Sequence, residues 1–151
     1  MKRAHMWCLG LLVVVAGCGG GGGSVSISMQ PLSGKVGGQA WTFGTGETDS
    51  FLSTTDSVYV NLYSASFATC TGAAPPADTV IMQMPTAAGS YDLSLQQNAT
   101  FYVASTTSNY VATSGRLVID GVVGTTISGG LHATYNGDNT VDGQFHADIC
   151  P

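Results

Sequence analysis

Apolar and polar residues alternate near the C-terminal end of the sequence, on both sides of the turn-like stretch NGDNT (136–140). The alternating positions are Leu131, Ala133, Tyr135, Val141, Gly143 and Phe145. A period of two is typical of a strand with one buried face. A five-residue loop pairs Tyr135 with Val141 and Leu131 with Phe145, all facing the core. The sequence therefore predicts an antiparallel hairpin here.

Similar short segments recur along the rest of the chain, and Gly or Pro interrupts every stretch that is long enough for a helix. They include 57–64, 79–84, 89–95 and 100–104, and Gly37-Gly38 separates two further segments as in a tight hairpin. Short strands with frequent turn signals favour an all-β fold. We expect an antiparallel β-sandwich, immunoglobulin-like or jelly-roll-like, with a barrel as the alternative.

The N-terminal residues 1–17 have the order of features of a secretory signal. Two basic residues precede an apolar stretch (6–16) that is shorter than the about 20 residues of a membrane-spanning helix. The end of this segment, VAGC (15–18), resembles the lipobox of bacterial lipoproteins. The resemblance implies that the signal is cut before Cys18 and that this cysteine is lipidated. An ordinary secretory signal with an incidental cysteine is the alternative.

Five glycines (19–23) follow Cys18 and predict a flexible tether, because glycine has a high entropic cost of ordering and buries no side chain. We therefore divide the chain into a signal (1–17), a lipidated cysteine with its tether (18–30) and one β-domain (31–151). Gly19 stands where the inner-membrane retention signal of lipoproteins has Asp. The resemblance thus implies the outer membrane, with the domain facing the periplasm or the cell surface.

The cysteine count follows from this division. Cys8 is lost with the signal and Cys18 is lipidated, so Cys70 and Cys150 remain. In an oxidising compartment they should form a disulfide. The chain-entropy model gives such a long loop about 4–5 kcal/mol of stabilisation. Zinc binding is the poorer interpretation of the pair, because structural zinc sites use four ligands in close pairs.

Charge restricts the partners. Beyond the signal, the chain keeps two cationic side chains, Lys35 and Arg116, against nine carboxylates. Phosphate backbones require clustered Lys and Arg, so nucleic-acid binding is excluded as a function class. The membrane, through the lipid, is the one partner that the sequence predicts.

One polar face of the predicted hairpin carries candidate metal ligands. In the predicted register His132 lies opposite Gln144, which leaves His146 diagonally across at roughly 7 Å. Asp142 and Asp148 share this face, so His132, Asp142 and His146 form a candidate metal site. The alternative is a solvated outer face with ordinary polar residues, since catalytic zinc needs three convergent ligands and supporting hydrogen bonds.

An alternating stripe of Tyr59, Asn61 and Tyr63 points away from the apolar face of its strand. Aromatic rings and an amide in a row could stack on a sugar or contact a protein partner. Cross-strand aromatic packing explains the same pattern.

The domain resembles small, uncharacterised bacterial lipoproteins of the kind found in myxobacteria. The matching elements are SGKVGGQAWTF (33–43), GSY (89–91) and ISGGLHATYNGDNTVDGQFHADIC (127–150). This resemblance implies a fold and a compartment, and it transfers no catalytic residue.

No G-x-S-x-G elbow or other catalytic constellation occurs in the sequence. We expect a lipid-anchored envelope protein with a non-enzymatic structural or binding role and no cofactor. An envelope protein or a glycan remains open as its further partner. Metal binding at the His132 face and carbohydrate binding at the Tyr59 stripe are the alternatives.

Overall fold

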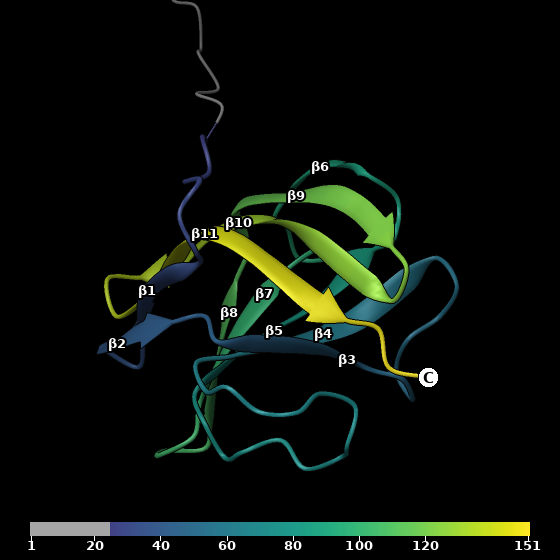
Figure 1. Ribbon diagram of the computed structural model, residues 1–151. Helices are drawn as coiled ribbons and strands as arrows, with labels where there is room; N and C mark the ends of the chain where they lie inside the picture. Colours follow the sequence, from purple (N-terminus) through teal and green to yellow (C-terminus); the bar gives the residue numbers. More distant parts are fainter. Residues whose placement is uncertain (1–24) are drawn as a thin grey trace, which may run out of the picture.

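The computed structural model describes residues 25–151 (Figure 1). The lipobox, Cys18 and the glycine tether lie outside the described residues. All regular elements from residue 25 onward are β-strands, which confirms the predicted all-β class. Within this part of the chain, no helix is present that has the length and apolarity to cross a membrane.

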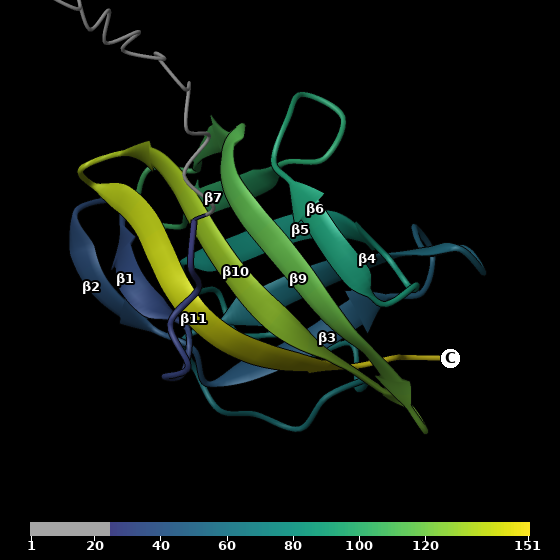
Figure 2. The same ribbon diagram turned by 90° about the horizontal axis from the view of Figure 1, so that it is seen from above.

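Eleven strands within residues 25–151 form one sheet. Their bounds are β1 Ser33–Val36, β2 Gln39–Thr42, β3 Thr45–Asp49, β4 Ser57–Tyr63, β5 Thr79–Pro85, β6 Gly89–Asp92, β7 Ala99–Val103, β8 Ser108–Ala112, β9 Ser114–Val123, β10 Thr126–Asn136 and β11 Asn139–Asp148. The strand order is β6-β9-β10-β11-β3-β4-β5-β7-β8, and the β1–β2 hairpin joins the sheet beside β11. The sheet curls into a half-barrel (Figures 1 and 2).

The sheet is mixed, so the prediction of a purely antiparallel arrangement was wrong at one seam. β11 lies parallel to β3, with Asp148 beside Glu47, whereas β3 and β4 are antiparallel. Hairpin turn residues mark antiparallel neighbours only. β11 is the last strand and β3 lies in the first part of the domain, so no short turn connects them. No local sequence pattern therefore predicts their pairing.

The concave side of the sheet holds the core. Its largest fully buried side chain is Phe101, and Leu62, Leu117 and Leu131 are also completely buried. In β4 the residues alternate as predicted, because Val58, Val60 and Leu62 are buried while their neighbours face the other side. This outer face of β3 and β4 carries the site described below.

The predicted C-terminal hairpin is present, but its register was wrong by two residues. His132 lies opposite Asp142 and Asn136 opposite Asn139, so Gly137-Asp138 is a two-residue turn. Asn136 Oδ1 stabilises this turn, because it accepts hydrogen bonds from the Asp138 amide (3.0 Å) and from Asn139 Nδ2 (3.1 Å).

A register irregularity between Thr134 and Asn136 leaves Tyr135 unpaired. Tyr135 is 51% exposed instead of facing the core. Its ring packs on Tyr110 of β8, with 5.4 Å between ring centroids.

The segment that precedes β1 crosses the outer face of β10 and β11 (Figure 2). Gln144 holds it with its backbone, which bonds to Gln30 and Leu32, and with its side-chain amide, which donates to the carbonyl of Ser28 at 2.7 Å. The Ser28 amide in turn donates to Asp142 Oδ1 at 3.3 Å. The part of the chain that the structure describes therefore begins on this outer face.

Candidate binding pocket at the disulfide

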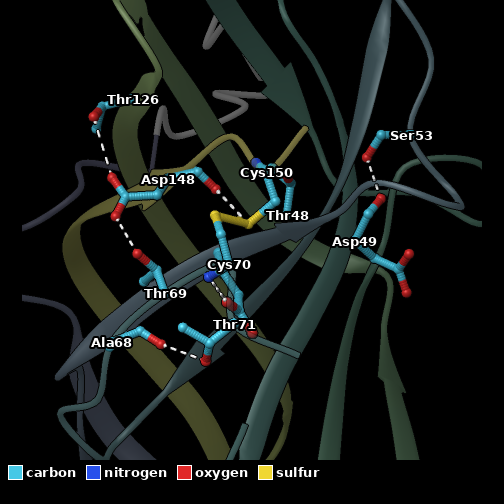
Figure 3. Close-up of a disulfide and its surroundings, with 11 residues drawn as sticks. Thr48, Asp49, Ser53, Ala68, Thr69, Cys70, Thr71, Thr126, Asp148 and Cys150 are labelled. Carbon is cyan, nitrogen blue, oxygen red and sulfur yellow. Dashed lines mark hydrogen bonds between the residues drawn. A yellow bond between two sulfur atoms is a disulfide. The ribbon is translucent and has the colours of Figure 1, made fainter. Parts of the chain in front are cut away.

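The predicted disulfide between Cys70 and Cys150 is confirmed, with 5.2 Å between the two Cα atoms. Cys70 belongs to the β4–β5 loop (64–78), and Cys150 follows the last strand (Figure 3). The bond therefore fastens a long loop to the end of β11. The amide of Cys150 also donates to Thr48 Oγ1 of β3 at 2.9 Å, which fixes the second cysteine against the sheet.

Polar contacts hold the β4–β5 loop independently of the disulfide. The Cys70 amide donates to Glu47 Oε2 at 2.7 Å, and Thr69 Oγ1 donates to Asp148 Oδ2 at 2.7 Å (Figure 3). The Phe67 ring packs edge-on against Tyr63, with 5.1 Å between centroids. These contacts bind the loop to β3, β4 and β11.

Cys70 adopts a φ of +59°, a left-handed conformation that is uncommon for residues other than Gly, Asn and Asp. Such a conformation persists only where the surroundings enforce it. Here the Glu47 hydrogen bond and the disulfide both act on Cys70.

A pocket of about 330 Å³ lies between the outer face of β3–β4 and this loop. We call it the disulfide pocket. It is lined by Glu47, Thr48, Asp49, Ser50, Asn61, Tyr63, Cys70, Gly72, Ala74, Cys150 and Pro151. Glu47 and Asn61 are direct cross-strand partners, so their side chains share one face of the sheet.

The pocket is acidic. Glu47 is only 9% exposed, and Asp49 lies two residues further along the same face of β3. No lining residue is cationic. Of the two Lys and Arg side chains in residues 25–151, Lys35 belongs to β1, and Arg116 of β9 pairs with Asp92 at 3.2 Å.

The pKa of the Tyr63 phenol reports the same environment. Burial raises it above its ordinary value of 10.0, and the carboxylates of Glu47 and then Asp49 raise it further. A phenolate would be poorly solvated here and would be repelled by both carboxylates. The Tyr63 hydroxyl therefore stays neutral at physiological pH and can both donate and accept a hydrogen bond.

The predicted stripe on β4 is divided between two depressions. Asn61 and Tyr63 line the disulfide pocket. Tyr59 lines a separate, smaller hollow of about 150 Å³ with Gln83 and Asn98 among its neighbours. The three side chains thus share a strand face without forming one surface.

The candidate metal ligands on the C-terminal hairpin do not converge. His132 Nδ1 and Asp142 Oδ1 are 3.3 Å apart, since the two residues are directly paired. His146 lies four residues beyond Asp142, roughly 13 Å along the strand. Its ring packs edge-on against Phe43, with 5.2 Å between centroids. Asp148 instead accepts hydrogen bonds from Thr69 and Thr126.

Glu47 is the site residue that sequence reasoning missed. It stands in a short polar segment, TGETD (45–49), that has no apolar alternation. Its burial comes from the β4–β5 loop, whose contact with β3 depends on tertiary structure. A second carboxylate at Asp49 is the one sequence feature that could have drawn attention to this strand.

The lining can bind polar groups in several ways. Glu47 and Asp49 offer negative charge, and Asn61 and Tyr63 offer both donors and acceptors. Comparison with protein-family models, with curated proteins and with solved structures finds no match to this chain.

Proposed function

We propose that this protein is a non-enzymatic binding module of the bacterial cell envelope, and that the disulfide pocket is its binding site. The observation that carries the proposal is a polar, open pocket whose lining includes two carboxylates and no cation. A strongly polar hollow that is fixed by a covalent bridge suits a small polar ligand, because its groups are held in place before binding.

The ligand that this lining favours carries a positive charge. Glu47 and Asp49 attract a cationic group. One oxygen of each carboxylate already accepts backbone amides, from Cys70 at Glu47 and from Phe51 and Leu52 at Asp49, and no lining side chain is cationic. Partial burial strengthens such an attraction relative to bulk water. An ammonium group also donates several hydrogen bonds, which match the acceptors of the carboxylates and Asn61.

The place of the protein is part of the same proposal. Lipidation of Cys18 would hold the domain at a membrane, with the outer membrane favoured by the glycine that follows it.

We further propose that the curled sheet packs as a sandwich rather than a closed barrel. The contact between Tyr110 of β8 and Tyr135 of β10 supports two facing layers.

Calorimetric titration of the disulfide-bonded protein with spermidine tests the ligand class. Binding should weaken with salt, as for any charged contact near a surface. Glu47→Gln and Asp49→Asn should each weaken it about fivefold or more, for a lost attraction of ~1 kcal/mol. Asp92 lies on β6, outside the pocket, so Asp92→Asn is the control and should leave spermidine binding unchanged. The absence of binding by spermidine would contradict the proposed class.

Carbohydrate binding is the second candidate, because Asn61 and Tyr63 of the predicted stripe line the same pocket. Carboxylates and an amide can bind sugar hydroxyls without a positive charge. Neutral oligosaccharides, titrated in parallel with spermidine, separate the two classes. Sugar binding that is insensitive to salt and lost in Asn61→Ala would favour this candidate.

A further inference from the structure

Three metal-ligating side chains meet at the wall of the disulfide pocket. A carboxylate oxygen of Glu47 and the Sγ atoms of Cys70 and Cys150 all lie within 4.8 Å of one another. In residues 25–151 this is the one group of three such donors. Figure 3 shows both cysteines against β3, beside Thr48. While the two sulfurs are joined in the disulfide they are not available as thiolate ligands, so the group can bind a metal ion only after reduction.

We propose that reduction of the Cys70–Cys150 disulfide converts this group into a binding site for Zn²⁺, with Glu47 as the third protein ligand. The inference goes beyond the proposed function, which concerns the disulfide-bonded protein. Zinc binds thiolate sulfur and carboxylate oxygen, and it accepts three protein ligands with water as the fourth. The adjoining pocket supplies the space for that water.

The required movement is small. Two sulfurs on one tetrahedral zinc ion are roughly 3.8 Å apart, given Zn–S bonds of about 2.3 Å. The Cα atoms are already 5.2 Å apart, so side-chain rotation can separate the sulfurs without moving the strands. The loop also keeps its other contacts on reduction, because the Thr69–Asp148 hydrogen bond and the Phe67–Tyr63 packing do not involve sulfur.

A backbone hydrogen bond from Cys70 orients the Glu47 carboxylate for zinc binding. Its Oε2 accepts the Cys70 amide at 2.7 Å, which orients the carboxylate and leaves Oε1 available. Hydrogen bonds of this kind position metal ligands and are worth considerable affinity. After reduction, two thiolates beside a buried carboxylate would repel one another, and no lining cation offsets them. A divalent ion removes that repulsion.

The chemistry balances with a dithiol as the reductant. A thiolate of the dithiol attacks Sγ of Cys70, which is the exposed cysteine of the pair, and Cys150 leaves as a thiolate. The second thiol of the reductant then displaces Cys70 and closes a disulfide within the reductant. The protein disulfide thus gains two electrons and two protons. Zinc binding afterwards releases the two thiol protons.

Metal titration of the reduced protein tests the proposal. The full mature chain is reduced with dithiothreitol and desalted without oxygen, and Zn²⁺ is then titrated against a chromophoric chelator. Co²⁺ serves as a spectroscopic substitute, since cobalt–thiolate bonds absorb strongly. We expect one ion per chain, a cobalt–thiolate band and a zinc-dependent rise in the Tm of the reduced protein. The disulfide-bonded protein should show none of these.

Two matched variants assign the third ligand. Removal of a group that only supports a metal ligand already lowers affinity 10–100-fold, so Glu47→Gln should weaken zinc binding by about tenfold or more. Asp49→Asn removes the same charge from the same strand and pocket wall and should leave zinc affinity within about twofold. Spermidine binding, in contrast, should weaken in both Glu47→Gln and Asp49→Asn. The zinc proposal and the spermidine proposal can therefore be contradicted independently of each other.

Three results would overturn the inference. One is reduced protein that binds zinc no more tightly than the Cys70→Ser/Cys150→Ser variant. Another is equal zinc affinity in Glu47→Gln and Asp49→Asn. The third is a reduced chain that unfolds and stays unfolded when zinc is added, whereas zinc-induced refolding that is lost in Glu47→Gln would support the site.

Discussion

The backbone amide of Cys70 donates a hydrogen bond of 2.7 Å to the carboxylate of Glu47, 23 residues earlier in the chain. This contact joins the β4–β5 loop to the outer face of β3 at the point where the disulfide joins the same loop to the end of β11. A carboxylate, a disulfide and a polar pocket therefore lie together. Both proposals for this protein depend on that junction.

Removal of the disulfide should destabilise the domain substantially. Loss of a native disulfide from a small secreted domain costs about 2–5 kcal/mol. We expect Cys70→Ser/Cys150→Ser to fall in this range, measured by urea unfolding of the oxidised parent and the variant. The C-terminal end and the β4–β5 loop should also exchange their amide hydrogens faster. A loss below about 1 kcal/mol would show that the hydrogen bonds alone hold the loop.

Glu47 should tune the titration of Tyr63. In Glu47→Gln the Tyr63 pKa should fall, since a neighbouring negative charge is lost, yet it should stay above 10.0 because burial is the largest cause of the shift. The glutamine oxygen can still accept the Cys70 amide, so the fold is kept. Ultraviolet absorbance during alkaline titration measures the phenolate. An unchanged Tyr63 pKa in Glu47→Gln, with Asp92→Asn as control, would contradict the described environment.

The same shift sets the sign of an alkaline effect on stability. A pKa that is raised in the folded state means that the folded protein holds the Tyr63 proton more tightly than the unfolded chain. The resulting stabilisation is complete below pH 10.0, the ordinary value, and is lost as the pH rises through the folded-state value. Tyr63→Phe should therefore flatten the decline of the free energy of unfolding above about pH 10. An equally steep decline in Tyr63→Phe would refute this.

Two glycines of β9 offer a matched test of sheet packing. Gly115 and Gly121 both have a φ of +139°, so alanine is strained at either position. A Cβ atom at Gly115 would overlap the carbonyl oxygen of His132, whereas a Cβ at Gly121 would meet nothing within 4 Å. Gly115→Ala should be less stable than Gly121→Ala by about 1–3 kcal/mol, the usual cost of overpacking. Equal thermal unfolding of the two variants would contradict the β9–β10 register.

The proposed anchor has a direct test of its own. Cys18→Ser should move the protein from the membrane fraction to the soluble fraction of the cell envelope, because the lipid is the proposed attachment. Mass spectrometry of the mature wild-type N-terminus should find Cys18 as the first residue, carrying acyl chains. An unmodified Cys18 preceded by an intact residue 17 would contradict lipidation.

Local signals predicted much of this fold. Alternation placed Val58, Val60 and Leu62 in the core, and two cysteines left after the expected processing predicted the disulfide. The hairpin register was missed by two residues because the turn has two residues, Gly137-Asp138, whereas the polar stretch NGDNT suggested a loop of five. Nothing local could predict the parallel contact of β11 with β3.

The site was harder to predict than the fold. The wrong register brought His132 and His146 close together, whereas the structure separates them along β11. The burial of Glu47 depends on the β4–β5 loop, which the Cys70–Cys150 disulfide holds against β3 and the end of β11. Residues that such a long-range contact brings together show no characteristic spacing in the sequence, so sequence patterns do not predict the site.

The most direct test of the central claim is a map of where a ligand binds. Amide chemical shifts of the isotope-labelled, disulfide-bonded protein are recorded during titration with spermidine. We expect saturable shifts confined to the disulfide pocket, at Glu47, Asp49, Asn61, Tyr63 and Cys70, and their loss in Glu47→Gln. Shifts centred instead on the His132 face or on Tyr59, or no saturable shifts at all, would contradict it.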